Sequence, residues 1–287
     1  MFETHVTPQP PYDWKQVLYR LQLDPLYEID IEAQSLKLPV LFEGGYEIVT
    51  IRGLGAIEAP QLHLSSSSEL TDALMEECAR VLGFRKPLQS IFDYFQETEL
   101  AGLFQAHRGT PIVLDMGVFP SLAKCIIHQQ LNLKFAFTLT TRFVQTFGTQ
   151  KEGVWCYPTP AQLAEVTVED LRALQFSTRK AEYVLSIAKA FAEERFTEQM
   201  FLDSSDEHVY DLLIKERGIG PWTIQNVLMF ALGRENLFPF ADIGLQNALK
   251  QWYGLETKPA LAWMEEKVVQ WEPYRSYAAL YLWRSIE

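Results

Sequence analysis

Two glycines separated by one residue and followed at once by proline and tryptophan are the feature of this sequence best suited to chemistry. Gly218 and Gly220 stand in the stretch ERGIGPWTIQNVLMFALG, and Pro221 suits the first position of a helix that ends at Gly233. Glycine lets another backbone approach closely, and a helix N-terminus presents unpaired N–H groups at a positive dipole end. Such a turn can bind a phosphate without a basic side chain. From the glycines alone, a plain hairpin between two helices is an equally good interpretation.

Asp242 and Trp222 are the other residues near this hairpin whose side chains could do chemistry. Asp242 precedes the apolar-periodic segment IGLQNAL, so its position alone supports a role as helix N-cap at least as well as catalysis. Trp222 is readily explained by core packing, while its indole face would also attract a cationic ring by roughly 0.5–2 kcal/mol. Position alone therefore does not decide between helix capping and catalysis for Asp242, or between packing and ligand binding for Trp222.

Several other kinds of active site lack their motifs. Cys78, Cys125 and Cys156 form no C-x-x-C pair, so they are expected to be buried thiols rather than disulfides or ligands of zinc or iron–sulfur clusters. The histidines show no H-x-x-x-H or H-E-x-x-H spacing, and there is no G-x-S-x-G motif or P-loop. We therefore expect no cofactor or metal for catalysis, and no hydrolase or phosphoryl-transfer chemistry by those routes.

The composition describes a folded protein with an acidic surface. The 287 residues are 48% hydrophobic and 22% charged, which is enough for two compact domains. Lysine and arginine number 25 against 37 aspartates and glutamates, so binding of nucleic acid by bulk electrostatics is not expected. No apolar run is long enough for a membrane span and the N-terminus does not resemble a signal peptide, so we expect a cytoplasmic protein without membrane contact.

The elements that position these residues differ between the two parts of the chain. Between residues 26 and 64 short stretches alternate in the manner of strands, with a hairpin turn expected at Gly44-Gly45. Ser66 and Glu69 form a capping-box pattern that predicts a helix up to about Leu82, where Gly83 stops it. After about residue 88 strand signals disappear, and the remainder predicts a succession of helices.

The fold class is therefore α+β, with a small antiparallel sheet in an N-terminal domain and a mostly helical core behind it. We place the N-terminal domain at 1–100 and the helical core at 101–287. Within the core, one subdomain covers 120–233 and contains the hairpin, and the other combines 101–119 with 234–287. The active cleft is expected between these two subdomains.

The hairpin followed by Asp242 resembles the helix-hairpin-helix of base-excision DNA glycosylases, in which an aspartate stands about 20 residues after the hairpin. Within that superfamily the sequence is most similar to the bacterial inducible 3-methyladenine DNA glycosylases (type II). The similarity is spread over six segments in the order of that family: PYDW at 11–14, IIHQQLNLKFAFTLTTRFVQTFG at 126–148, CYPTPAQLAEV at 156–166, RKAEYVLSIA at 179–188, the hairpin with Asp242, and WEPYRSYAALYLW at 271–283.

The resemblance implies an enzyme of base excision repair that flips an alkylated purine, of the 3-methyladenine or 7-methylguanine type, out of duplex DNA and hydrolyses its N-glycosidic bond. Asp242 would face the deoxyribose C1′, stabilise oxocarbenium charge, and orient or deprotonate the attacking water. Trp222 and Tyr274 would stack on the base, and Gln130 would fill the gap left by the flipped nucleotide. Strand-cleaving members carry a Schiff-base lysine where this sequence has Trp222, so a monofunctional enzyme without lyase activity is implied.

The same resemblance implies local contacts to DNA that would serve an acidic protein. The predicted phosphate contacts are Gly218, Gly220, Thr178, Arg179 and Lys180. Carbonyl groups of the hairpin would hold a monovalent structural cation, Na⁺ or K⁺, and the predicted ligands are Ile214, Glu216 and Ile219. Glu216 departs from the LPG of most hairpins of the family and brings a like charge near the expected phosphate.

Several of these residues also have interpretations that involve no contact with DNA. Tyr274 lies in an aromatic C-terminal helix where packing is a strong alternative, Gln130 is also typical of a solvated helix junction, and basic residues at a helix start often bind nothing specific. The partner is expected to be double-stranded DNA with damaged bases, bound by a monomer. Alternatives are the same fold acting on uracil, hypoxanthine or an oxidised purine, a damage-sensing DNA-binding protein without catalysis, and a helical interaction module that binds no nucleic acid.

Overall fold

The N-terminal part of the chain is built on a five-stranded antiparallel sheet with strand order β1-β5-β4-β3-β2. The computed structural model describes residues 1–42 and 44–286. The strands are β1 (Phe2–Val6), β2 (Glu28–Asp30), β3 (Ser35–Phe42), β4 (Gly45–Gly53) and β5 (Leu62–Ser66). Phe42 pairs with Gly45, so the predicted hairpin between β3 and β4 is confirmed, although its turn residue Glu43 lies outside the described residues. The predicted α+β class is confirmed as well.

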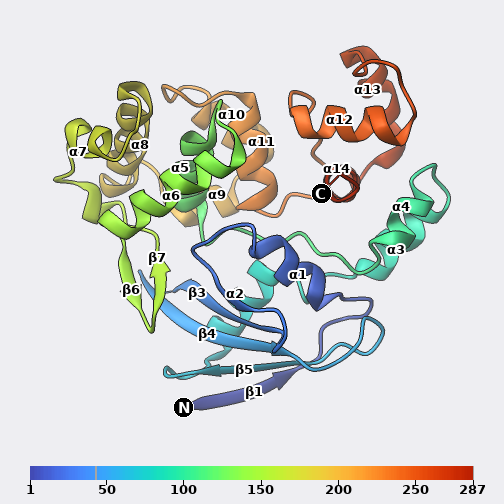
Figure 1. The fold of residues 1–287 in the computed structure, drawn as a ribbon, viewed down its shortest axis with the longest axis horizontal. Helices are drawn as coiled ribbons and strands as arrows, with labels where there is room; N and C mark the ends of the chain where they lie inside the picture. Colours follow the sequence, from blue (N-terminus) through green and yellow to red (C-terminus); the bar gives the residue numbers. More distant parts are fainter. Residues whose placement is uncertain (43, 287) are drawn as a thin grey trace.

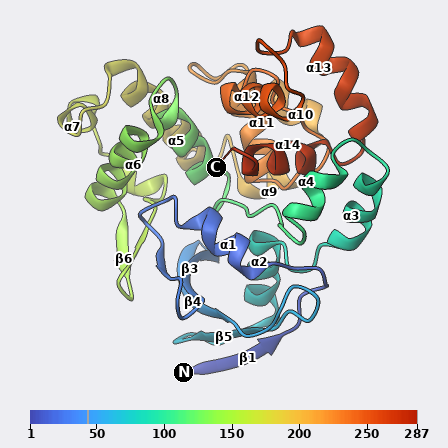
Figure 2. The same cartoon turned by 45° about the vertical axis from the view of Figure 1, so that its right-hand side comes forward.

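Two helices cover one face of this sheet, α1 (Trp14–Leu21) and α2 (Asp72–Leu82), as Figure 2 shows. The alternating residues Leu36, Leu38 and Val40 of β3 are buried and belong to the same core as the apolar sides of both helices. The period-2 pattern of the strands thus decides which face of the sheet the helices cover.

The start of α2 differs from its prediction. Ser66 pairs in β5 and donates its hydroxyl to the carbonyl of Ile48 at 2.8 Å, so it is part of the sheet and the predicted capping box is wrong. Thr71 is the N-cap instead and accepts from the amide of Leu74. The predicted stop at Gly83 is confirmed, because this residue adopts a left-handed conformation with φ 66°.

The rest of the described chain is mainly helical, and none of its helices is long and apolar enough to cross a membrane. The helices are α3 (Leu88–Gln96), α4 (Ala101–Ala106), α5 (Val118–His128), α6 (Leu133–Phe147), α7 (Val168–Ala173), α8 (Thr178–Ala192), α9 (Glu198–Asp203), α10 (Asp206–Leu213), α11 (Pro221–Phe230), α12 (Ile243–Trp252), α13 (Leu261–Val268) and α14 (Arg275–Arg284), with 3-10 turns η1 (Ala161–Leu163) and η2 (Val269–Trp271).

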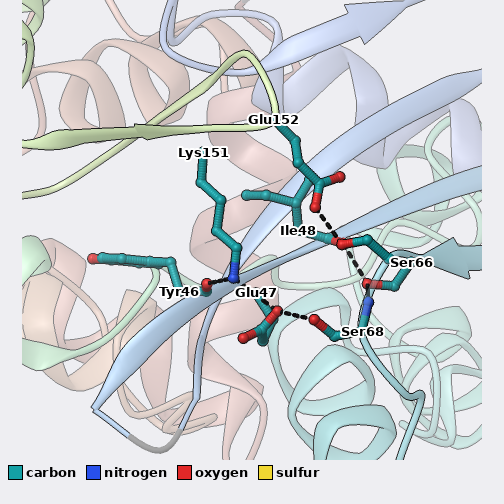
Figure 3. Close-up of polar contacts among 8 residues, drawn as sticks. Tyr46, Glu47, Ile48, Ser66, Ser68, Lys151 and Glu152 are labelled. Carbon is teal, nitrogen blue, oxygen red and sulfur yellow. Dashed lines mark hydrogen bonds and ion pairs between the residues drawn. The ribbon is translucent and has the colours of Figure 1, made fainter.

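A small hairpin of β6 (Thr149–Lys151) and β7 (Val154–Cys156) interrupts the helices, so the expectation of no strands after residue 88 is wrong. Strands of three residues are too short to show an alternating pattern. The hairpin docks on the large sheet, where the Lys151 ammonium donates to the carbonyl of Tyr46 at 2.6 Å and pairs with Glu47 at 2.9 Å (Figure 3). The two parts of the chain are therefore joined by polar contacts as well as by the backbone.

The apolar side chains gather in two large cores. The first joins the sheet and α1 to α4 with the C-terminal helices, and it includes the stacked rings of Phe95, Phe104 and Tyr281. The second is formed by α5 to α11. Figure 1 shows α5 to α8 on one side and the C-terminal helices α12 to α14 on the other, both above the sheet. The predicted domain limits concern folding units and stay predictions.

Candidate active site

A cavity of about 520 Å³ lies where the two cores meet, a size typical of sites for small molecules. One wall comes from α1 and the loop after it, a second from α5 and α6 with the segment that precedes them, and a third from α11, α12 and α14. The lining includes Asp24, Lys124, Trp222, Phe230, Asp242 and Trp283. Charged groups and aromatic rings therefore line one cavity.

Asp242 is the N-cap of α12, and its half-buried carboxylate lines the cavity. Oδ1 accepts the amide of Leu245 at 2.8 Å and the indole N–H of Trp283 at 2.9 Å. Oδ2 accepts the indole N–H of Trp222 at 3.1 Å. The Asp242 carboxylate thus caps α12 and faces the cavity at the same time. Three donors fix its orientation.

Trp222 and Trp283 are the aromatic residues that the structure brings to this carboxylate. Trp222 is the second residue of α11, and Trp283 reaches the same cavity from α14. Tyr274, the predicted second stacking residue, does not line the cavity. Its ring packs edge-on against Tyr94 with the centroids 5.4 Å apart. The sequence did not single out Trp283, because aromatic residues occur on several faces of α14.

The Gly-x-Gly turn connects α10 to α11 as predicted. Gly218 has φ 88°, and a Cβ on it would lie 2.1 Å from the ring of Tyr183, so the fold itself requires glycine there. Gly220 is the N-cap of α11 with an extended backbone, and a Cβ built on it meets no atom within 4 Å. The N-cap position of α11 therefore has open space beside it.

The predicted cation ligands lie along the same turn. Ile214 is the C-cap of α10. The carbonyl of Glu216 accepts the amide of Ile219 at 3.1 Å, which leaves one lone pair of that oxygen unused. The carboxylate of Glu216 pairs with Arg195 at 3.1 Å, and its side chain is only 16% exposed. The negative charge of Glu216, expected near a DNA phosphate, is thus compensated by Arg195.

Gln130 lies in the short turn between α5 and α6, as predicted, and is exposed with φ 57°. Positive φ is uncommon for a residue with a side chain and marks a tightly determined turn. Its neighbour Gln129 donates to the carbonyl of Gly218 at 2.9 Å and to the hydroxyl of Thr223 at 3.1 Å. The turn that carries Gln130 is therefore tied directly to the hairpin.

Thr178, Arg179 and Lys180 begin α8, but the structure does not gather their side chains. Thr178 and Arg179 are exposed, whereas the Lys180 ammonium donates to the carbonyl of Ile127 at 2.6 Å. Burial lowers the pKa of Lys180 to about 8. Lys180 thus supports the end of α5 behind the Gln130 turn, and its role at a phosphate stays a prediction.

Comparison with known proteins gives consistent relatives. Residues 123–273 match the model of the HhH-GPD superfamily base excision DNA repair proteins. The sequence is 49% identical to "Putative DNA-3-methyladenine glycosylase YfjP" of Bacillus subtilis over the whole of both chains. It is 25% identical to "DNA-3-methyladenine glycosylase 2" of Escherichia coli, over 96% of this chain and 94% of that one. The fold matches a 3-methyladenine DNA glycosylase from Archaeoglobus fulgidus with a TM-score of 0.85 and 22% identity, over 98% and 97% of the chains.

Proposed function

The chain belongs to the HhH-GPD superfamily of base excision DNA repair proteins, and we propose that it is a DNA-3-methyladenine glycosylase that hydrolyses the N-glycosidic bond of alkylated purines in duplex DNA. The observation that carries this proposal is the carboxylate of Asp242, which lines the cavity and is held there by two indole N–H groups. A protein that only binds DNA does not need a carboxylate in that position.

The chemistry follows from the charge of the substrate. Methylation at N3 or N7 makes the purine cationic, so the faces of Trp222 and Trp283 attract it once it is flipped into the cavity. When the bond from C1′ to N9 breaks, both electrons stay with the base, which leaves as a neutral molecule. The Asp242 carboxylate stabilises the positive charge that develops on the deoxyribose. It then accepts a proton from the water molecule that attacks C1′.

We propose a monofunctional enzyme because none of the described residues brings a free amine to the cavity beside the hairpin. Trp222 occupies the position of the Schiff-base lysine of strand-cleaving relatives, and the ammonium of Lys124, which also lines the cavity, forms an ion pair with Asp115. Treatment with borohydride during the reaction should therefore trap no covalent complex between protein and DNA.

Binding to duplex DNA would rest on the hairpin and the Gln130 turn. The open N-cap position of α11 can approach a phosphate, and the carbonyls of Ile214, Glu216 and Ile219 would hold a monovalent cation that neutralises it. Gln130, exposed at a turn that Gln129 ties to the hairpin, would enter the gap left by the flipped nucleotide. We propose that a monomer acts in this way on damaged DNA in the cytoplasm.

The direct test is incubation with randomly methylated duplex DNA and chromatography of the released bases. The wild-type protein should release 3-methyladenine and 7-methylguanine. Asp242→Asn keeps an acceptor for the cap of α12 but loses the charge, so release should fall by a factor of roughly 10² or more, at least about 2.7 kcal/mol of transition-state stabilisation. Normal release by a folded Asn variant would rule out this mechanism.

A further inference from the structure

The cavity contains a second group of charged residues that the proposed reaction does not use. Arg20, Asp24, Asp115 and Lys124 all line it, and we refer to these four residues as the polar wall. They come from α1, from the loop that follows it, from the segment before α5 and from α5 itself. Burying charged groups beside a flat aromatic ligand is costly unless the ligand offers hydrogen bonds in return.

The polar wall is held in place by the surrounding fold. Both oxygens of Asp115 are used, one in the ion pair with Lys124 and the other by the Ser121 hydroxyl at 2.7 Å. The amide of Asp115 also donates to the carbonyl of Phe230 at 2.6 Å. An ammonium has three donors, and the pair with Asp115 uses only one. Lys124 is therefore a positioned donor with hydrogen-bonding capacity to spare.

Asp24 supplies the matching acceptor. Its Oδ1 accepts the amide of Leu26 at 3.0 Å, and its Oδ2 accepts no hydrogen bond from any described residue. Burial raises the pKa of Asp24, and the positive charge of Lys124 opposes that shift. The second oxygen of this half-buried carboxyl is therefore available at the cavity to accept a hydrogen bond from a bound molecule.

We propose that Lys124 and Asp24 recognise the edge of the flipped base, Lys124 donating to a carbonyl or ring nitrogen and Asp24 pairing with an N–H. This inference rests on the proposed function, since it requires that the cavity receives a base. With the glycosidic nitrogen near Asp242, the far edge of a purine faces the other walls of the cavity. The substrate class is then a purine lesion whose six-membered ring keeps a free donor and a free acceptor, such as a guanine-type O6 with N1–H.

The polar wall would discriminate between damaged bases by a different property than aromatic stacking does. Indole faces respond to the charge of the base, whereas buried hydrogen-bonding groups reject an analogue that leaves them unpaired. Hypoxanthine and 1,N6-ethenoadenine separate the two effects, because both bases are neutral. Hypoxanthine keeps its N1–H and O6 free, whereas in ethenoadenine the etheno bridge occupies N1 and N6 on the same edge. We expect the wild-type protein to excise hypoxanthine at least about tenfold faster than ethenoadenine under single-turnover conditions.

Substitution of the wall should remove that preference. Asp24→Leu should lower excision of hypoxanthine and of 7-methylguanine at least about tenfold while leaving ethenoadenine excision unchanged or faster. Asp24→Asn keeps an acceptor, so its rates on hypoxanthine and 7-methylguanine should lie between those of the wild-type protein and those of Asp24→Leu. The double variant Lys124→Met with Asp115→Asn should have the same selective effect without leaving an unpaired charge.

Asp30→Asn is the matched control for Asp24→Asn. Asp30 also accepts a backbone amide, that of Ala33 at 2.8 Å, but it is exposed and does not line the cavity, so the lesion preference should not change. Equal losses on all three lesions, or a wild-type preference for ethenoadenine, would overturn the role of the polar wall and leave the glycosylase intact. Failure of the wild-type protein to release any base would instead overturn the proposed function, and the polar wall with it.

Discussion

Trp222 donates its indole N–H to Oδ2 of Asp242 at 3.1 Å, so the residue that follows the hairpin and the residue that begins α12 meet on one carboxylate. Trp283 donates to the other oxygen. Trp222 therefore has two properties that substitutions can separate, an N–H that orients Asp242 and a ring face that attracts a cationic base.

Trp222→Phe keeps a ring and removes the N–H, whereas Trp222→Ala removes both. The Phe variant should lose a similar factor, about tenfold, on 7-methylguanine and on hypoxanthine, because both reactions need an oriented Asp242. The Ala variant should lose more on the cationic base than on the neutral one. Single-turnover rates on matched duplexes measure both effects. A Phe variant with full activity would mean that the bond to Asp242 has no part in catalysis.

Gly244, in the first turn of α12, offers a test of how tightly Asp242 is held. A Cβ on Gly244 would lie 3.1 Å from Oδ1 of Asp242 and 3.4 Å from Nε1 of Trp283. Gly244→Ala should therefore push this pair apart and lower kcat several-fold, while the higher helix propensity of alanine limits the loss of stability. Thermal unfolding and excision kinetics measure the two separately, and an unchanged kcat would show that the pair tolerates the shift.

Much of this site follows from local rules that a sequence displays. Gly218, Gly220 and Pro221 define the start of α11, and Asp242 stands where a helix N-cap must stand. Gln130 lies in the turn between two helices as predicted, and Asn132, a typical N-cap residue, marks the start of the second helix. The existence and type of the strands from β2 to β5 followed from their alternating pattern in the same way.

What escaped prediction depends on contacts between distant segments. Trp283 could not be separated from the other aromatic residues of α14, since only the packing of that helix beside α12 brings it to Asp242. The polar wall is assembled from four segments that share no motif. The hydrogen bond from the Lys180 ammonium to the carbonyl of Ile127 joins α8 to α5, and no local pattern in the sequence indicates it.

Gln130 and Gln129 should affect excision in different ways. Gln130→Ala removes the exposed side chain, so it should slow excision from a stable base pair several-fold more than from a mismatch, where the base leaves the stack at lower cost. Gln129→Ala breaks the tie to Gly218 and Thr223 and should slow both substrates. Identical behaviour of Gln130→Ala on paired and mismatched lesions would count against a wedge.

His128, at the end of α5, should make stability depend on pH. Burial, helped by the positive charge of Lys124, lowers its pKa from 6.5 to about 3, and its Nε2 lies 3.0 Å from the Thr140 hydroxyl. Between these two pH values the unfolded chain binds a proton that the folded chain does not. The free energy of unfolding therefore has its full value, as far as His128 is concerned, above about pH 6.5. It decreases progressively as the pH falls toward 3.

His128→Gln keeps a polar partner for Thr140 and removes this proton. The drop in melting temperature between pH 7 and pH 5 should thus be smaller by a few degrees than in the wild-type protein. His208→Gln, at an exposed position of α10, is the matched control and should follow the wild-type curve. Parallel curves for wild type and His128→Gln would show that the imidazole titrates freely in the fold.

Gly220→Asp separates DNA binding from folding better than any other substitution in the hairpin. Because Gly220 is an N-cap with an ordinary φ and open space around its Cα, aspartate should fit and even stabilise α11 by a few tenths of a kcal/mol. The same carboxylate stands where a phosphate must approach, so affinity for damaged and undamaged duplexes alike should fall at least about tenfold, about 1.4 kcal/mol. Gly220→Ala adds the Cβ without the charge and should lose much less. Fluorescence anisotropy at fixed salt, with thermal unfolding of each variant, measures both quantities, and unchanged affinity in a folded Gly220→Asp protein would remove the hairpin from the DNA interface.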